Sequence, residues 1–174
     1  RQGRPDAAEW RLRIAGIVDQ KSEPYLARLR ALAGGDPAVE FRLRPSDEEM
    51  RESYRRCFAT LFTAFNEDWG LVIIEAMASA KPVVAVDRGG PREIVQHERD
   101  SLLAPPEIED FAAAMRRLAD DPALYQRLSQ EALQASRRFG WPAFVEALDE
   151  AIERGVRTAR RPRLVPGTAA EARP

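Results

Sequence analysis

Residues 65–95 read FNEDWGLVIIEAMASAKPVVAVDRGGPREIV, and this stretch decides the fold. An apolar run ends at Phe65, a polar turn follows it, and a second apolar run covers residues 71–80. The composition of the second run is helical, and Lys81-Pro82 ends it, because proline cannot continue a helix. The first half of the stretch therefore predicts a strand, a turn and a helix.

The second half of the stretch repeats this order. Residues 83–86 are all β-branched or small, as expected of a strand that is buried on both faces. Gly89-Gly90 then leads into a helix that opens at Pro91, since proline suits the first helical position. Strands that alternate with helices in this way are typical of a parallel sheet.

The same alternation extends on both sides of the stretch. Further strands are expected at residues 12–18, 39–43, 59–65 and 101–104, and further helices at residues 23–33, 46–56 and, from Ile108 onward, in three helical segments that end near Val156. Ser46 with Glu49 forms a capping-box pattern at the second of these helices. The sequence therefore predicts an α/β fold with a Rossmann-like, doubly wound parallel sheet and C-terminal helices.

The composition suggests one domain with short extensions. Residues 1–11 are polar and resemble the end of a linker, and residues 12–156 are long enough for one domain with its own core. Residues 157–174 are rich in Arg, Ala and Pro and poor in apolar residues, so we expect a disordered tail there. Such a basic tail also allows contact with acidic lipid, although a solvated tail is the simpler expectation.

Charge and cysteine content exclude several classes of protein. The formal net charge is −1, which gives no basic field for a nucleic-acid partner. No apolar run approaches the ~20 residues that a membrane span requires. The single Cys57 fits a reducing compartment, so a cytoplasmic location is expected. The single His97 excludes a histidine-rich metal site.

The main candidate functional residues lie in the turn and helix that follow Phe65. Glu67 lies in the turn, Gly70 lies where the helix should begin, and Glu75 lies inside the helix with seven residues between the two glutamates. Free N–H groups at a helix start attract phosphate, and a glycine lets an anion approach the backbone closely. Carboxylates accept hydrogen bonds from sugar hydroxyls. This arrangement suits a nucleoside-diphosphate sugar.

An ordered set of short motifs makes a family resemblance specific. The motifs are Glu67, Gly70, Glu75-Ala76-Met77-Ala78, Pro82-Val83-Val84 and Gly89-Gly90. This segment resembles the glutamate-x7-glutamate motif of the retaining family-4 glycosyltransferases, and the resemblance extends more weakly over residues 12–152. It implies the donor-binding half of a two-domain GT-B enzyme that transfers a hexose from a nucleoside-diphosphate sugar with retention of configuration.

The resemblance also implies roles for individual residues. Glu67 is expected to be catalytic, facing the transferred hexose near the reacting carbon, and Glu75 is expected to bind the donor ribose. The backbone of residues 69–71 (Trp69, Gly70 and Leu71) is expected to hold the distal phosphate and the sugar hydroxyls. Arg44 matches the position where the family's backbone meets the base, and Gly16 matches the glycine turn after the first strand. The base is of UDP or GDP type, with ADP as an alternative, and neither a metal nor a cofactor is expected.

The sequence departs from the family at several positions. The family usually has Gly where Leu43 stands and Phe where Trp69 stands, and the first change bears on base recognition. An Arg and a Lys that neutralise the diphosphate precede the first strand in the family, and residues 1–11 lack that segment. We therefore expect a half-enzyme that requires an N-terminal acceptor domain as its partner, with peripheral membrane association of the full enzyme as a further possibility.

Other interpretations of the same residues remain open. Glu67 also suits a helix cap, Trp69 suits core packing, and Gly89-Gly90 suits a purely structural turn. A GT-B epimerase or phosphorylase shares the fold, but a phosphorylase needs a pyridoxal lysine, and neither lysine of this chain lies in a recognisable cofactor segment. A dinucleotide-binding module needs three glycines after the first strand, where this chain has Gly16 alone. A receiver-like module needs clustered acids, for which Asp19 and Glu67 are weak candidates.

Overall fold

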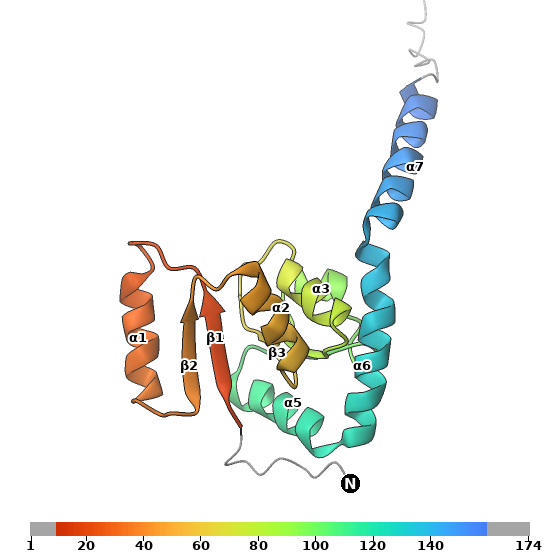
Figure 1. Cartoon of the computed structure of the whole chain (residues 1–174). Coiled ribbons are helices and arrows are strands. Elements are labelled where there is room, and N and C mark those ends of the chain that lie inside the picture. Colours follow the sequence, from red (N-terminus) through yellow and green to blue (C-terminus); the bar gives the residue numbers. More distant parts are fainter. Residues whose placement is uncertain (1–9, 160–174) are drawn as a thin grey trace, which may run out of the picture. The chain divides into compact units, whose positions relative to one another are not determined.

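The computed structural model describes residues 10–159, which form an α/β protein (Figure 1). Its elements in chain order are β1 (Leu12–Gly16), α1 (Glu23–Ala33), β2 (Val39–Leu43), α2 (Asp47–Arg56), β3 (Thr60–Phe62), α3 (Leu71–Ala78), β4 (Val83–Val86), α4 (Pro91–Ile94), β5 (Leu102–Ala104), α5 (Ile108–Asp120), α6 (Pro122–Ser136), the 3-10 helix η2 (Arg137–Phe139) and α7 (Trp141–Ala159). The chain divides into two compact units, one up to Ser136 and one from Arg137 onward.

All the strands in the described residues pair in parallel, as expected. β1 pairs with β2 in one sheet, with Leu12 opposite Val39 and Gly16 opposite Leu43. β3, β4 and β5 form the other sheet, in that order, with β4 in the centre. The expected α/β class with parallel strands is confirmed, but the strands belong to two hydrogen-bonded sheets instead of one.

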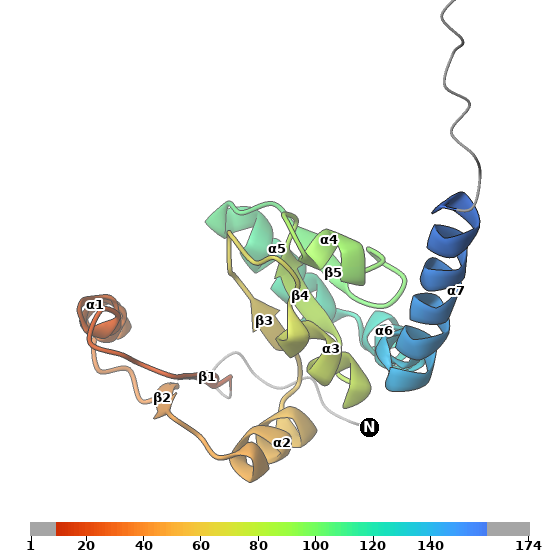
Figure 2. The same cartoon turned by 90° about the horizontal axis from the view of Figure 1, so that it is seen from above.

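The core of the first unit surrounds β4, whose four residues are all buried. The β3–β4–β5 sheet lies between α3 and α5 (Figures 1 and 2), and α6 packs against both helices. Apolar side chains from these elements form the core cluster, which consists of Val84, Leu102, Ala104, Leu118, Leu124 and Leu128. A strand covered on both faces explains why residues 83–86 lack the alternation of a half-exposed strand.

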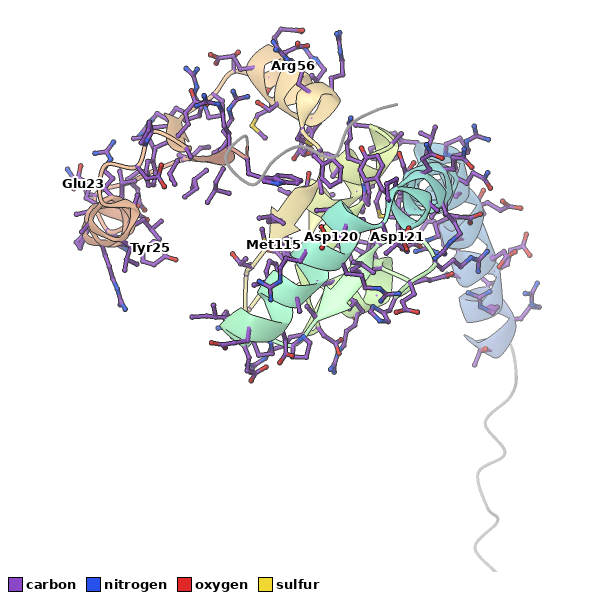
Figure 3. The ribbon with its side chains drawn as sticks, turned by 90° about the horizontal axis from the view of Figure 1, so that it is seen from below. Glu23, Tyr25, Arg56, Met115, Asp120 and Asp121 are labelled. Atoms are coloured by element: carbon purple, nitrogen blue, oxygen red, sulfur yellow. The ribbon has the colours of Figure 1, made fainter. Side chains whose placement is uncertain are left out.

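Several helix boundaries follow from local chemistry. At the start of α2, Ser46 Oγ accepts a hydrogen bond from the Glu49 N–H, and the Glu49 carboxylate accepts one from the Ser46 N–H, which confirms the capping box. α1 ends at Gly34, which adopts the left-handed conformation with φ of 58°. Asp121 lies at the junction of α5 and α6 (Figure 3), where its carboxylate accepts a hydrogen bond from the Leu124 N–H.

The structure shortens one of the expected strands. β3 ends at Phe62, although the sequence predicted a strand as far as Phe65. Its pairing with β4 stops where Phe62 lies opposite Ala85, and the following residues 63–66 are exposed. β1 ends at Gly16, where the turn after the first strand was expected. The correction at β3 lengthens a loop at the carboxyl ends of the strands, where parallel sheets place their ligands.

The second unit consists mainly of α7. This helix continues to Ala159, three residues past the expected end of the domain. One side of it carries a row of exposed apolar residues, namely Trp141, Phe144, Val145, Leu148, Ile152 and Val156. The remainder of the expected tail, residues 160–174, and most of the expected linker, residues 1–9, lie outside the described residues.

Candidate functional site

The turn that carries Glu67 contacts the turn after β4. The Gly90 N–H donates a hydrogen bond of 2.9 Å to the Glu67 carbonyl oxygen. A Cβ atom on Gly89 would lie 2.9 Å from that same oxygen, and a Cβ on Gly90 would lie 2.2 Å from the Trp69 carbonyl oxygen. Both distances are too short for real contacts, so the two turns approach this closely only because residues 89 and 90 are glycines.

Gly70 forms the start of α3 and is itself fixed by the backbone. Its φ of 115° lies in a region that side chains strongly disfavour, and a Cβ there would meet Ile73 Cδ1 at 3.2 Å. Gly70 occupies the N-cap position with no side-chain cap hydrogen bond, so Glu67 is not the helix cap. The first turn of α3 contains no acidic residue, and Leu71 is 65% exposed. The positive end of the helix dipole therefore lies next to the buried Gly70, without a carboxylate from its own first turn.

Glu67 and Trp69 lie in the same turn at the edge of the sheet. Glu67 is half-buried, and Trp69 is 40% exposed, so Trp69 is not a core residue as one interpretation supposed. The structure thus brings together Glu67, Trp69, Gly70 and Leu71 with the Gly89-Gly90 turn. We call this group the donor turn, after the role that the sequence resemblance leads us to expect.

Glu75 lies one helical turn further along α3, and its side chain is exposed. Its Oε2 atom accepts a hydrogen bond of 2.9 Å from the hydroxyl of Tyr54 on α2. Burial and the nearby Glu75 carboxylate raise the pKa of Tyr54 well above its ordinary value, so the hydroxyl stays protonated and acts as the donor. Tyr54 is therefore a hydrogen-bond partner that orders the Glu75 carboxylate.

Sequence reasoning did not identify Tyr54. The available signal was the spacing of Met50 and Tyr54, which lie four residues apart in an otherwise polar and charged helix. Such spacing marks the inward side of a helix. It does not reveal which residue of another helix the hydroxyl meets.

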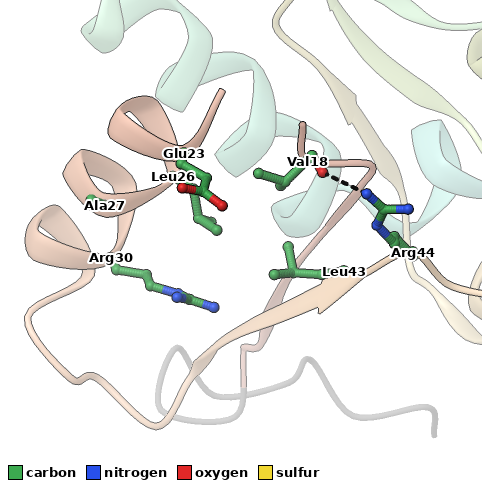
Figure 4. A pocket seen from close by; sticks show the side chains of 7 residues that line it. All are labelled: Val18, Glu23, Leu26, Ala27, Arg30, Leu43 and Arg44. Carbon is green, nitrogen blue, oxygen red and sulfur yellow. Dashed lines mark hydrogen bonds between the residues drawn. The ribbon is translucent and has the colours of Figure 1, made fainter. Parts of the chain in front are cut away.

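A cavity of about 560 Å³ opens between α1 and the ends of β1 and β2. It is lined by Val18, Glu23, Leu26, Ala27, Arg30, Leu43 and Arg44 (Figure 4). The Arg44 N–H donates to the Gly16 carbonyl oxygen at 2.8 Å, and the Arg44 guanidinium donates to the Val18 carbonyl oxygen at 3.0 Å. Arg44 also adopts a positive φ of 53°, which is uncommon outside glycine. The structure therefore brings the expected residues Gly16 and Arg44 together, and we call this space the strand-end cavity.

A second cavity, of about 260 Å³, lies beside the end of β3 and the start of α5. Its lining is mostly apolar and includes Phe65, Phe111 and Met115, the last of which is seen on α5 in Figure 3. No charged side chain lines this cavity. It differs in this from the strand-end cavity, whose lining includes Glu23, Arg30 and Arg44.

Within residues 10–159, no three His, Cys, Asp or Glu side chains cluster in a way that would hold a metal ion. Over the same residues, no helix has both the length and the apolar character needed to cross a membrane. Asp19, a candidate acid for a receiver-like site, instead accepts hydrogen bonds from the Ser22 N–H and hydroxyl. These bonds lower the pKa of Asp19, and through them its carboxylate stabilises a local turn.

Comparison with known proteins places this geometry in a family. Residues 3–135 match the family model described as glycosyl transferases group 1. A D-inositol 3-phosphate glycosyltransferase from Streptomyces bingchenggensis is 33% identical over 82% of this chain, and the match covers 31% of that protein. An exopolysaccharide phosphotransferase from Streptomyces coelicolor is 37% identical over 84% of this chain and 15% of that protein. The chain thus spans less than a third of the length of these relatives.

A solved structure agrees with the sequence comparison. Anabaena HepE, determined in complex with UDP and glucose, superposes with a TM-score of 0.74 at 25% identity, over 82% of this chain and 40% of HepE. The α/β fold is therefore the Rossmann-like fold of GT-B glycosyltransferases, as the sequence predicted. The chain belongs to the glycosyl transferases group 1 family.

Proposed function

We propose that this chain is the donor-binding half of a retaining family-4 hexosyltransferase. The observation that carries the proposal is the Glu75 carboxylate, which is exposed to solvent yet fixed by the hydroxyl of the buried Tyr54. It lies on the helix whose start follows the Glu67 turn and has no side-chain cap. One strand–turn–helix unit thereby offers a carboxylate for a ribose, N–H groups for phosphate and a second carboxylate for a hexose.

The donor binds across the donor turn and the strand-end cavity. The free N–H groups at Gly70 and Leu71 bind the distal phosphate, where the helix dipole favours negative charge. Glu75 accepts hydrogen bonds from the ribose hydroxyls. The base enters the strand-end cavity beside Gly16 and Arg44, whose mutual hydrogen bond fixes the loop there. HepE, whose structure contains UDP and glucose, supports a UDP-type donor, and GDP is the next candidate.

The transfer step uses Glu67 and the donor itself. The bond between the anomeric carbon and the leaving phosphate oxygen breaks, and the acceptor oxygen forms a bond to the same face of that carbon. The acceptor proton moves to the leaving phosphate. Basic side chains and the helix dipole offset the charge of the diphosphate, so we expect no metal and no cofactor. Glu67 accepts hydrogen bonds from the hexose hydroxyls and stabilises the positive charge that develops at the anomeric carbon.

The rest of the enzyme supplies the acceptor and the missing cations. The relatives are more than three times as long as the part matched here, which leaves room for an N-terminal acceptor domain. The exposed apolar row of α7 suits packing against such a domain, because large apolar patches commonly mark interfaces. A cytoplasmic enzyme with peripheral membrane contact completes the proposal, and the single Cys57 supports the cytoplasmic location.

A second candidate is transfer of a sugar phosphate. The 37% identity to the exopolysaccharide phosphotransferase favours it, although the match covers 15% of that protein. The two reactions differ in the bond that breaks. A donor labelled with ³²P in its β-phosphate distinguishes them when the full-length enzyme is used, since glycosyl transfer leaves the label in the nucleotide and phosphotransfer moves it to the acceptor.

Replacing Glu75 tests the ribose contact. The change Glu75→Ala should weaken binding of UDP or GDP by roughly 1–3 kcal/mol, or about 5- to 150-fold in Kd, because the hydroxyls lose a charged acceptor. Titration calorimetry measures the change, and Glu109→Ala in the exposed first turn of α5 is the control. An unchanged Kd in a folded Glu75→Ala protein would show that Glu75 does not bind the donor.

Replacing Gly90 tests the donor turn. In Gly90→Ala the added Cβ must move away from the Trp69 carbonyl oxygen, which displaces the start of α3. UDP binding should weaken more than uridine binding, because the phosphate site moves while the strand-end cavity stays in place. Gly155→Ala in α7 is the control, since a Cβ there has open space. Equal losses for UDP and uridine would argue against a phosphate site at the donor turn.

The isolated chain should bind a nucleoside diphosphate and transfer nothing. Each absent charge-assisted contact from the missing Arg and Lys costs about 1.5–3 kcal/mol, which moves a micromolar Kd toward the ~millimolar range. Transfer also requires an acceptor held close to the donor carbon, which the two-domain cleft provides. A transfer assay over UDP- and GDP-sugars, with and without the preceding part of the full-length protein, measures this. Efficient transfer by the isolated chain would contradict the half-enzyme proposal.

A further inference from the structure

Tyr54 is the buried residue of the surface helix α2. All residues of α2 are described, and Tyr54 is the one among them that is buried, with a fractional exposure of 7%. The next two residues, Arg55 and Arg56, are exposed. The ring anchors the helix, and the hydroxyl at its tip reaches Glu75 on α3 at 2.9 Å. The aromatic ring without its hydroxyl would supply the packing, so the hydroxyl has a role other than packing.

We propose that Tyr54 is a positioning residue of the donor site, which fixes the Glu75 carboxylate for the ribose hydroxyls. This inference rests on the proposed function of Glu75. A carboxylate has two oxygens with about four lone-pair directions. When Tyr54 holds Oε2, it also fixes the direction of Oε1, which then meets the ribose without further ordering.

The position of Glu75 in the helix explains why such a partner is needed. Its side chain is exposed, and an exposed glutamate samples several rotamers. Binding a ligand through a mobile side chain carries an ordering cost, which a preformed hydrogen bond removes. The bond from Tyr54 costs the carboxylate little, because it uses only Oε2 and leaves the second oxygen for the ligand. Pre-ordering of one such side chain corresponds to about 2- to 12-fold in affinity.

Helix α2 also links the two parts of the donor site. It begins just after Arg44, with the Ser46 cap, and it ends two residues past Tyr54. The Arg13 guanidinium on β1 donates a hydrogen bond of 3.2 Å to Ser53 Oγ, next to Tyr54 in the chain. One short helix therefore connects the residues of the strand-end cavity to the carboxylate on α3, and Tyr54 is the contact through which it does so.

The test removes only the hydroxyl. Tyr54→Phe keeps the ring. Tyr125→Phe is the matched control, because Tyr125 is half-buried and its ring stacks on that of Phe58, with 4.3 Å between the ring centroids. Calorimetry on the full chain compares UDP and GDP with their 2′,3′-dideoxy forms, which lack the hydroxyls that Glu75 would bind. Thermal unfolding of each variant reports the fold.

We expect Tyr54→Phe to weaken UDP or GDP binding about 2- to 12-fold and to leave binding of the dideoxy forms unchanged. The preference for the ribose form should therefore shrink, and in the Glu75→Ala background the Tyr54→Phe change should have no further effect. Tyr125→Phe should leave the preference intact.

The outcomes separate this inference from the proposed function. If Tyr54→Phe keeps the full ribose preference while Glu75→Ala loses it, the positioning role is wrong and the donor site stands. If Glu75→Ala also keeps the preference, the proposed function of Glu75 fails. Equal weakening of ribose and dideoxy ligands, or an unfolded Tyr54→Phe protein, would make Tyr54 a structural residue and would overturn the positioning role.

Discussion

The hydrogen bond from the Gly90 N–H to the Glu67 carbonyl oxygen joins the turns that follow two neighbouring parallel strands. β3 and β4 end at the same edge of their sheet, so their turns meet there. Two glycines allow the backbones to approach within a distance that any side chain would prevent. Glu67, the left-handed Gly70 and the start of α3 form one continuous turn, and this contact joins that turn to the turn after β4.

The ribose side of the proposed site depends on a different kind of contact. Tyr54 and Glu75 are 21 residues apart in sequence and belong to separate helices, yet their side chains meet. A buried aromatic ring fixes the hydroxyl, and the hydroxyl fixes an exposed carboxylate. The contact at Gly90 thus orders the backbone at Glu67, and the contact at Tyr54 separately orders the side chain of Glu75.

The features that were predicted correctly from the sequence are those that local chemistry controls. The capping box at Ser46, the proline start of α4 and the buried β4 are all in place, because each depends on residues close together in the chain. The predicted end of β3 was wrong, since a strand ends where its pairing ends and not where its apolar run does. The division into two sheets and the partner of Glu75 depend on distant residues, which spacing alone does not reveal.

The most direct test of the proposed donor site is to map the surface that binds the nucleotide. Titration of the isotope-labelled chain with UDP and GDP, followed by NMR, reports which backbone amides change. If one nucleotide binds across both parts of the site, amides should shift at the donor turn and Glu75 and also around Gly16 and Arg44. Both sets of shifts should give one common Kd. Shifts confined to other surfaces, such as the apolar cavity at Phe111 and Met115, would contradict the proposed site.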